Sequence, residues 1–218
     1  MSSSSSPAPA SDAASPTSNS QASILILAVA AFVIVTTEFL MVGLLPALAR
    51  DLAVSVSTAG QLVTLFAVVV MVFGPPLTAW LAHIERKRLF IAVVLLFAAS
   101  NALAAVAPNI WVLSLARIVP ALALPVFWGT ASETAAQMAG PARAGKAVSM
   151  VYLGISAAML LGIPLGTLAG DAIGWRGAFW ALAIMSLSIA LLLHVSMPTL
   201  KVGKRVAMAE QALSLIHI

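Results

Sequence analysis

Two charged residues, Glu38 and Arg117, lie well inside long apolar runs of the sequence. Glu38 interrupts the stretch "IVTTEFLMVG", and the nearest charge before it is Asp12. A charge at the bilayer centre costs roughly 2.5–3.5 kcal/mol on insertion scales, so such residues tend to face a cavity or a charged partner. A carboxylate in that position can bind a proton or a cation, and a guanidinium can orient it. A static ion pair that only orients two helices is the alternative.

The composition indicates a membrane protein whose main partner is the lipid bilayer. The chain has 218 residues, of which 61% are hydrophobic and 8% are charged, whereas soluble domains carry about 25% charged residues. The net charge of +4 does not indicate nucleic-acid binding, because the basic residues cluster in short loops between apolar runs. Cysteine is absent, which excludes disulfides, thiol nucleophiles and Cys-ligated metals.

Six segments are long and apolar enough to cross a membrane, which takes roughly 20 residues. We therefore expect an all-α, polytopic fold with a six-helix bundle over residues 22–200. The predicted spans are 23–49, 59–82, 89–107, 111–137, 147–170 and 177–197.

Both ends of the chain differ from this apolar body. Residues 1–21 are rich in Ser, Pro and Ala, which predicts a disordered tail. Residues 201–212 would begin a cytoplasmic linker. The last letters, "LSLIHI", equal the translation of a common sequencing-library adapter, so we interpret 213–218 as an artefact and the chain as a fragment. A natural amphipathic tail is the alternative.

The basic residues predict the orientation of the spans. Eight of the eleven Lys and Arg fall on one side, which the positive-inside rule assigns to the cytoplasm. Both termini are then cytoplasmic, and the expected location is the bacterial inner membrane. The eight residues are Arg86, Lys87, Arg88, Arg143, Lys146, Lys201, Lys204 and Arg205.

Glu38 and Arg117 lie at similar depths, and we predict that they form the proton or substrate site. Glu38 is about 15 Å and Arg117 about 9 Å from the outer ends of their spans, at 1.5 Å per helical residue. A direct pair or a shared water-filled cavity is therefore geometrically allowed. Arg117 could instead extend its head group to the interface.

Gly and Pro residues interrupt spans two and five. These two spans hold the same place in a three-plus-three repeat. Span two contains Gly74, Pro75 and Pro76, and span five contains "LGIPLGTLAG". Matching breaks in corresponding spans are typical of transporters built from inverted repeats. Close packing of ordinary membrane helices is the alternative.

A second group of polar residues lies at the cytoplasmic ends of spans two to four and predicts a loop gate. We expect Glu133 to pair with a basic residue of this loop rather than to contact a substrate. The loop residues are His83, Glu85, Arg86, Lys87 and Arg88.

Three stretches resemble the major facilitator superfamily, in particular its drug:proton antiporter type, which includes arabinose and other sugar efflux permeases. "TTEFLMVGLLPALARDLAVSVSTAGQLVTLFA" resembles the first hairpin, and "APNIWVLSLARIVPALALPVFWGTA" resembles the fourth span with its Arg at position 117. "GIPLGTLAGDAIGWRGAFW" resembles the antiporter motif of span five together with the "GWR" segment beyond it. The positions taken to carry this antiporter-like motif are Gly154, Gly162, Pro164, Gly166 and Gly170.

The resemblance implies twelve spans, of which this chain supplies the N-terminal half. The missing C-terminal half would be a partner, and the fragment would be inactive alone. It implies alternating-access efflux of a drug, sugar or related small molecule, with the proton gradient as driving force and no cofactor or metal.

The chain also departs from the family pattern. The loop usually reads G-x-L-a-D-R-x-G-R-K/R, but here "AWLAHIERKR" has His83 at the Asp position, so Glu85 and Arg86 are interpreted as a substitute acid–base pair. In span five, Pro164 is not adjacent to a Gly.

Two other classes of membrane protein are alternatives to a transporter. A membrane enzyme is not expected, because His83 and His194 are isolated on different spans and no metal-ligand or nucleophile motif occurs. A six-span scaffold or receptor without transport is the remaining alternative.

Overall fold

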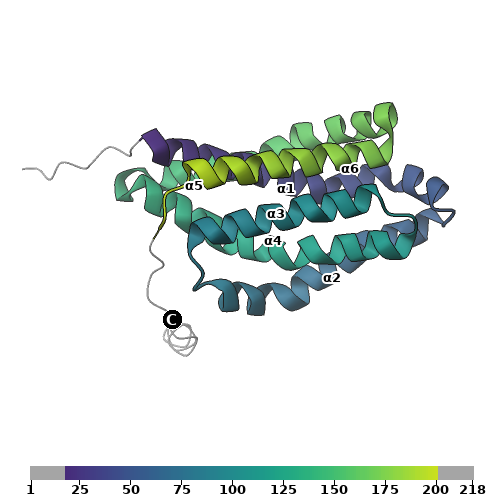
Figure 1. Cartoon of the computed structure of the whole chain (residues 1–218), viewed down its shortest axis with the longest axis horizontal. Coiled ribbons are helices and arrows are strands. Elements are labelled where there is room, and N and C mark those ends of the chain that lie inside the picture. The colour runs from purple at the N-terminus through teal and green to yellow at the C-terminus, as the bar shows by residue number, and fades with distance from the viewer. Residues whose placement is uncertain (1–17, 201–218) are drawn as a thin grey trace, which may run out of the picture.

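The computed structural model describes residues 18–200, and every regular element in that range is helical (Figure 1). The long helices lie side by side and form a bundle. In chain order the elements are α1 (Ser18–Asp51), α2 (Val56–Leu81), α3 (Arg86–Ala105), α4 (Ile110–Ala139), the 3₁₀ turn η1 (Pro141–Arg143), α5 (Ala144–Ala157), the π-helical turn η2 (Ala158–Gly162) and α6 (Ile163–Ser196).

Six crossings follow from these elements, as the sequence predicted. Five continuous helical stretches are long and apolar enough to span a membrane, and the last of them, Pro141–Ser196, has 56 residues. Gly174 divides that stretch, because its φ of 77° and ψ of 158° are not helical. Figure 1 shows the ribbon of α6 reversing its direction partway along its length. We call α5, η2 and α6 up to Gly174 span five, and the rest of α6 span six.

Side-chain caps explain where three helices begin. Ser55 accepts a hydrogen bond from the Thr58 amide at 3.0 Å, and Asn109 accepts from the Trp111 and Val112 amides. Such oxygens satisfy backbone donors that have no partner in the first turn of a helix. Glu85 caps α3 in the same way.

The packing of the helices has the symmetry of an inverted repeat. α1 packs against span five, α2 packs against α4, and α3 packs against α6. Exchanging spans one to three with spans four to six converts the first of these contacts into the second and leaves the third unchanged. The bundle therefore consists of two related three-helix units.

Small residues allow the closest of these contacts. A Cβ added at Gly154 would collide with the backbone oxygen of Ala28, and one at Gly162 would collide with the hydroxyl of Thr36. Gly43 of α1 faces Thr167 of span five in the same manner. Backbones without side chains between them approach closely, which favours van der Waals packing in a membrane.

The break expected in span two does not occur. α2 is helical from Val56 to Leu81 with Pro75 and Pro76 inside it, because neighbouring helices can support a span where Pro has removed hydrogen bonds. Gly74 instead makes room for the Pro125 ring of α4, whose Cγ lies 2.8 Å from the position of an added Cβ. Span five does carry an irregularity, the π turn η2, which ends two residues before Pro164.

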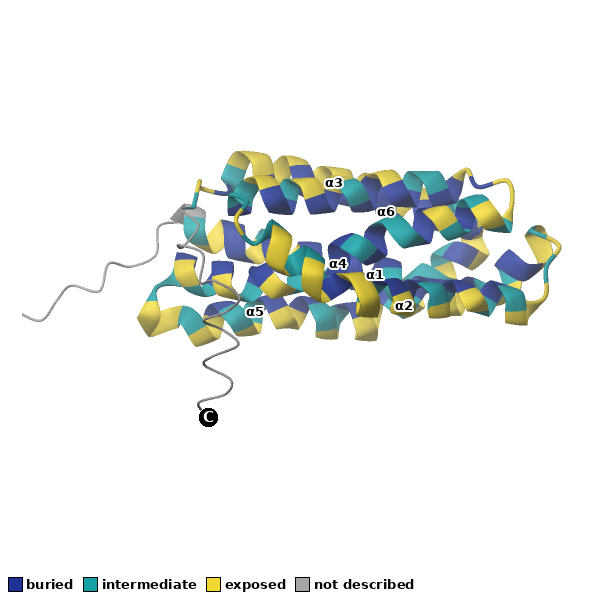
Figure 2. Cartoon of the chain, turned by 90° about the horizontal axis from the view of Figure 1, so that it is seen from below, coloured by how far each residue is buried: buried dark blue, intermediate teal, exposed yellow. Residues whose placement is uncertain are grey.

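Apolar side chains cover much of the outside of the bundle. Figure 2 shows buried positions facing neighbouring helices and exposed positions facing outward. Many of the exposed positions are large and apolar, for example Met71, Leu160 and Val195. Such a surface suits lipid rather than water.

The expectations for the chain ends lie almost wholly outside the described residues. Residues 1–17 and 201–218 are not described, so the tail, the linker and the adapter-derived segment stay predictions. Residues 18–21, the last of the expected tail, belong to α1.

Candidate functional site

Arg117 of α4 reaches across to the backbone of α1. Its Nη1 donates to the Thr37 carbonyl oxygen at 3.1 Å, and its Nη2 donates to the Glu38 carbonyl oxygen at 3.4 Å. The residue is only 2% exposed. Arg117 therefore does not extend to the interface, and its charge is fixed beside the turn that carries Glu38.

An aromatic ring of α2 completes the environment of this guanidinium. The Arg117 Cζ lies 4.7 Å from the centroid of the Phe66 ring, a cation–π distance. Arg117 thus joins α4, α1 and α2. Its Nε is buried and makes no hydrogen bond within the described part of the chain.

Glu38 and Arg117 line the same small cavity. It has a volume of about 80 Å³ and lies between α1, α2 and α4. Glu38 is partly buried there, and no salt bridge joins the two side chains in the described structure. Of the two arrangements that the sequence allowed, this structure contains the shared cavity. The remaining lining residues are Phe39, Val42, Val63, Phe66 and Ala67.

Further buried polar residues on α1 and α3 were not predicted from the sequence. Asn101 of α3 donates from Nδ2 to the Thr37 hydroxyl at 3.2 Å, and both residues are buried. Thr36 is buried next to them, and its hydroxyl makes no hydrogen bond among the described residues. Their signal in the sequence is polarity inside an apolar span, the same signal that identified Glu38.

At the end of the bundle that carries the loops 82–85 and 140–143, which we call the basic end, Arg86 and Glu133 form an ion pair. Arg86 Nη2 lies 3.1 Å from Glu133 Oε2, and Nη1 donates to the Ala82 carbonyl oxygen. The expected pairing of Glu133 is thereby confirmed, whereas a gating role stays a prediction. Of the three basic residues expected as partners of Glu133, the one that pairs with it is Arg86.

Glu85 instead caps α3, because its carboxylate accepts from the backbone amides of Lys87 and Arg88. It also approaches the exposed Arg88 guanidinium at 3.9 Å. His83 is exposed. A capping carboxylate is already engaged by backbone donors, which explains why Arg86 takes a partner from α4.

The opposite end of the bundle has an ion pair that was not predicted from the sequence. Asp51, the last residue of α1, accepts from Trp175 Nε1 at 2.8 Å and from Arg176 Nη1 at 3.3 Å. Arg176 also donates to the Ala107 carbonyl oxygen and stacks over the Trp175 ring at 4.1 Å. Span six is thereby tied to α1 and to the segment between α3 and α4.

The sequence model of the Major Facilitator Superfamily matches residues 27–215. The chain belongs to this superfamily. It is 36% identical over 179 residues to the Pasteurella multocida (strain Pm70) protein named "Probable sugar efflux transporter", covering 82% of this chain and 44% of that protein. It is 37% identical over 182 residues to the inner membrane transport protein YdhP of Escherichia coli (strain K12), covering 84% and 47%.

A solved structure shares the fold. A bacterial homologue of the human lysosomal transporter Spinster, in an inward-facing and unoccupied conformation, superposes with a TM-score of 0.75 at 14% identity. The match covers 86% of this chain and 45% of that structure. This chain spans about half the length of the curated relatives it matches. The predicted superfamily and six-span architecture are confirmed.

Proposed function

We propose that this chain is the N-terminal half of a proton-coupled efflux transporter for a small molecule such as a sugar or drug. Membership in a transporter superfamily and relatives that are named as sugar efflux transporters support the class. The cavity shared by Glu38 and Arg117 supports the coupling mechanism. The basic end would face the cytoplasm, following the positive-inside rule.

Glu38 is the proposed proton carrier. Its carboxylate lines the cavity, while the Arg117 guanidinium is held by backbone carbonyl oxygens and not by that carboxylate. A proton that binds Glu38 removes a negative charge beside a fixed positive one. The affinity of the cavity for a cation or a hydrogen-bonding substrate then changes. A difference in affinity between two conformations is what shifts their populations.

Alternating access would need a second half to close the cavity. The superposition with about half of a solved transporter, together with similar coverage of the relatives, supports a partner half encoded downstream. Reading the gene past codon 212 tests this point. A stop codon in the genome near that position, with no further spans, would instead favour the six-span scaffold or receptor.

Replacement of Glu38 by Gln in the complete transporter tests the coupling role. We expect proteoliposomes with Glu38→Gln to lose proton movement when arabinose is added under a pH gradient, while exchange of arabinose at equal pH persists. A pH-sensitive dye and labelled arabinose give the two readouts. Asp171→Asn is the matched control, because Asp171 is an exposed acid of span five outside the cavity, and it should behave as the unmodified protein.

The coupling proposal fails if the Glu38→Gln protein moves as many protons in response to arabinose as the unmodified protein does. If the unmodified protein transports neither arabinose nor protons, arabinose is not its substrate. The same assay is then run with amphipathic drugs.

A further inference from the structure

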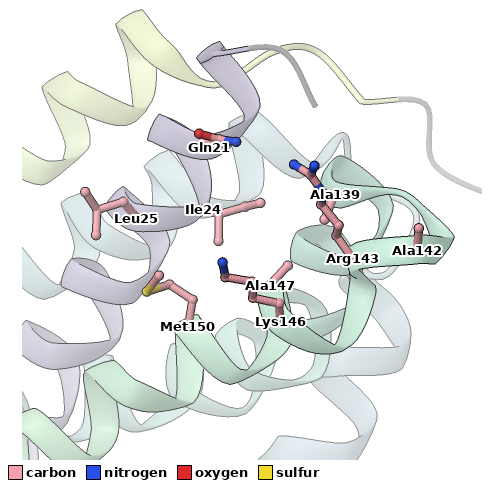
Figure 3. Close-up of a pocket in the computed structure, with 9 residues that line it drawn as sticks. All are labelled: Gln21, Ile24, Leu25, Ala139, Ala142, Arg143, Lys146, Ala147 and Met150. Atoms are coloured by element: carbon pink, nitrogen blue, oxygen red, sulfur yellow. The ribbon is translucent and has the colours of Figure 1, made fainter. Parts of the chain in front are cut away.

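A second cavity lies at the basic end, among residues that the proposed transport mechanism does not use. It has a volume of about 530 Å³ and is formed by the first turns of α1, the end of α4, the turn η1 and the start of α5 (Figure 3). It shares no lining residue with the cavity of Glu38 and Arg117. Pockets of this size accommodate a small-molecule ligand or a lipid headgroup.

One part of the lining of this cavity is apolar and another part is polar. Ile24, Leu25 and Met150 contribute apolar surface, and Arg143, Lys146 and the Gln21 amide contribute polar groups. Figure 3 shows the Arg143 and Lys146 side chains extending from the α5 side, with Gln21 facing them from α1. A ligand that fills this space needs both an anionic part and an apolar part.

The two cations in this cavity have no counter-charge among the described residues 18–200. Neither Arg143 nor Lys146 forms an ion pair within residues 18–200. The described acids at this end, Glu85 and Glu133, are engaged by backbone amides and by Arg86 respectively.

The backbone at the start of α5 adds positive potential to the cavity. The start of α5 has no side-chain cap, and the N-terminal end of a helix favours an anion. The segment that follows α6 lies outside the described residues; in the sequence it carries Lys201, Lys204 and Arg205 against one acid, Glu210, and so has no net negative charge. Charge complementarity therefore favours an external anion over this segment of the chain.

We propose that this cavity binds the phosphate headgroup of an anionic phospholipid from the adjacent leaflet. Arg143 and Lys146 bind the phosphate, and the beginning of an acyl chain lies along Ile24, Leu25 and Met150. The cavity lies where the apolar run of α1 begins, which is the level of the headgroups. Basic pockets between transmembrane helices on the cytoplasmic side are suited to such lipids.

Native mass spectrometry of this chain in detergent, with added phosphatidylglycerol or phosphatidylcholine, tests the site. We expect phosphatidylglycerol to remain bound and phosphatidylcholine to dissociate. The double variant Arg143→Gln/Lys146→Gln should bind phosphatidylglycerol at least about tenfold more weakly, because it loses two charge-assisted hydrogen bonds. Both positions are exposed, so the variant should fold.

The matched control is Lys87→Gln/Arg88→Gln, which removes the same charge at the same end but outside the cavity. It should bind phosphatidylglycerol as the unmodified chain does. Equal weakening in both double variants would show a general attraction of the basic end and overturn the site. Equal binding of phosphatidylcholine would overturn the selectivity for an anion. Displacement of phosphatidylglycerol by an equal concentration of glycerol phosphate would show a soluble anion site instead of a lipid site.

Discussion

The Arg86 guanidinium at the start of α3 pairs with the Glu133 carboxylate near the end of α4, with 3.1 Å between Nη2 and Oε2. At the opposite end, Arg176 at the start of span six pairs with Asp51 at the end of α1, at 3.3 Å. When spans one to three are exchanged with spans four to six, the Arg86–Glu133 pair takes the position of the Arg176–Asp51 pair. Because the repeats are inverted, the same type of contact ties helices together at both ends of the bundle.

Removing the Glu133 carboxylate should destabilise the basic end. The Arg86 side chain is 7% exposed, whereas that of Glu133 is 53% exposed. Glu133→Ala leaves a buried cation with the Ala82 carbonyl oxygen as its hydrogen-bond acceptor. We expect a loss of about 1–3 kcal/mol, the cost of a buried donor without its charged partner, measured as a lower unfolding midpoint in detergent.

Arg88→Gln is the control for this prediction. The contact of Arg88 with Glu85 is long and its side chain is 87% exposed, and exposed ion pairs contribute about 0–1 kcal/mol. Its unfolding midpoint should stay near that of the unmodified chain. A Glu133→Ala midpoint as high as that of Arg88→Gln would contradict the structural role of the Arg86–Glu133 pair.

Removing Asp51 should cost less than removing Glu133, although the two positions correspond. The side chains of Arg176 and Asp51 are 43% and 50% exposed, so solvent screens their attraction. Asp51→Ala also leaves the indole N–H of Trp175 without its acceptor. We expect about 0.5–2 kcal/mol from that hydrogen bond. The same melting experiment checks the order, and Asp171→Asn controls for loss of an acid at this end.

The glycines of span five should tolerate Ala in an order set by what they face. Gly154→Ala meets a backbone oxygen of Ala28, which cannot rotate away, whereas Gly166→Ala meets the flexible end of Leu40. Gly60→Ala in α2 meets nothing within 4 Å and should stabilise slightly, because Ala is favoured over Gly in a helix by about 0.5–1 kcal/mol. Unfolding midpoints should therefore fall in the order Gly60→Ala, Gly166→Ala, Gly154→Ala. A Gly154→Ala midpoint above that of Gly166→Ala would mean that α1 and span five are not in backbone contact.

Gly174 should resist replacement even by Asn. Its φ of 77° with ψ of 158° lies in a region that is essentially restricted to Gly, outside the left-handed helical region that Asn adopts. Gly174→Ala and Gly174→Asn should each lose about 1–3 kcal/mol. Gly145→Ala is the control, because Gly145 has open space around it. Recovery of stability in Gly174→Asn alone would place this residue in the left-handed helical region.

The spans could be predicted from the sequence because hydropathy and length decide whether a segment crosses a membrane. That Glu133 pairs with a basic residue of the loop could be predicted, because three such residues lie at the same membrane face, but which of the three could not. The contacts of Arg117 could not be predicted either, since depth along a span does not tell which face a side chain occupies. Pro75 and Pro76 were expected to break span two. α2 stays helical through both residues, because it packs against α4. The role of Thr37 required the position of α3, which no local pattern encodes.

Arg117→Lys should separate the charge of this residue from its geometry. A guanidinium reaches the Thr37 and Glu38 carbonyl oxygens with two nitrogens and covers the Phe66 ring, whereas an ammonium is a compact point charge. We expect a lower unfolding midpoint and a loss of about 1–3 kcal/mol, as a charged hydrogen bond is removed from a buried site. Phe66→Leu keeps both hydrogen bonds and should lose only the cation–π contact, together with some packing, about 0.5–2 kcal/mol. If Arg117→Lys melts at or above the midpoint of the unmodified chain, the two carbonyl contacts do not hold α4 against α1. The proposed coupling then lacks a positive charge that these contacts fix in place.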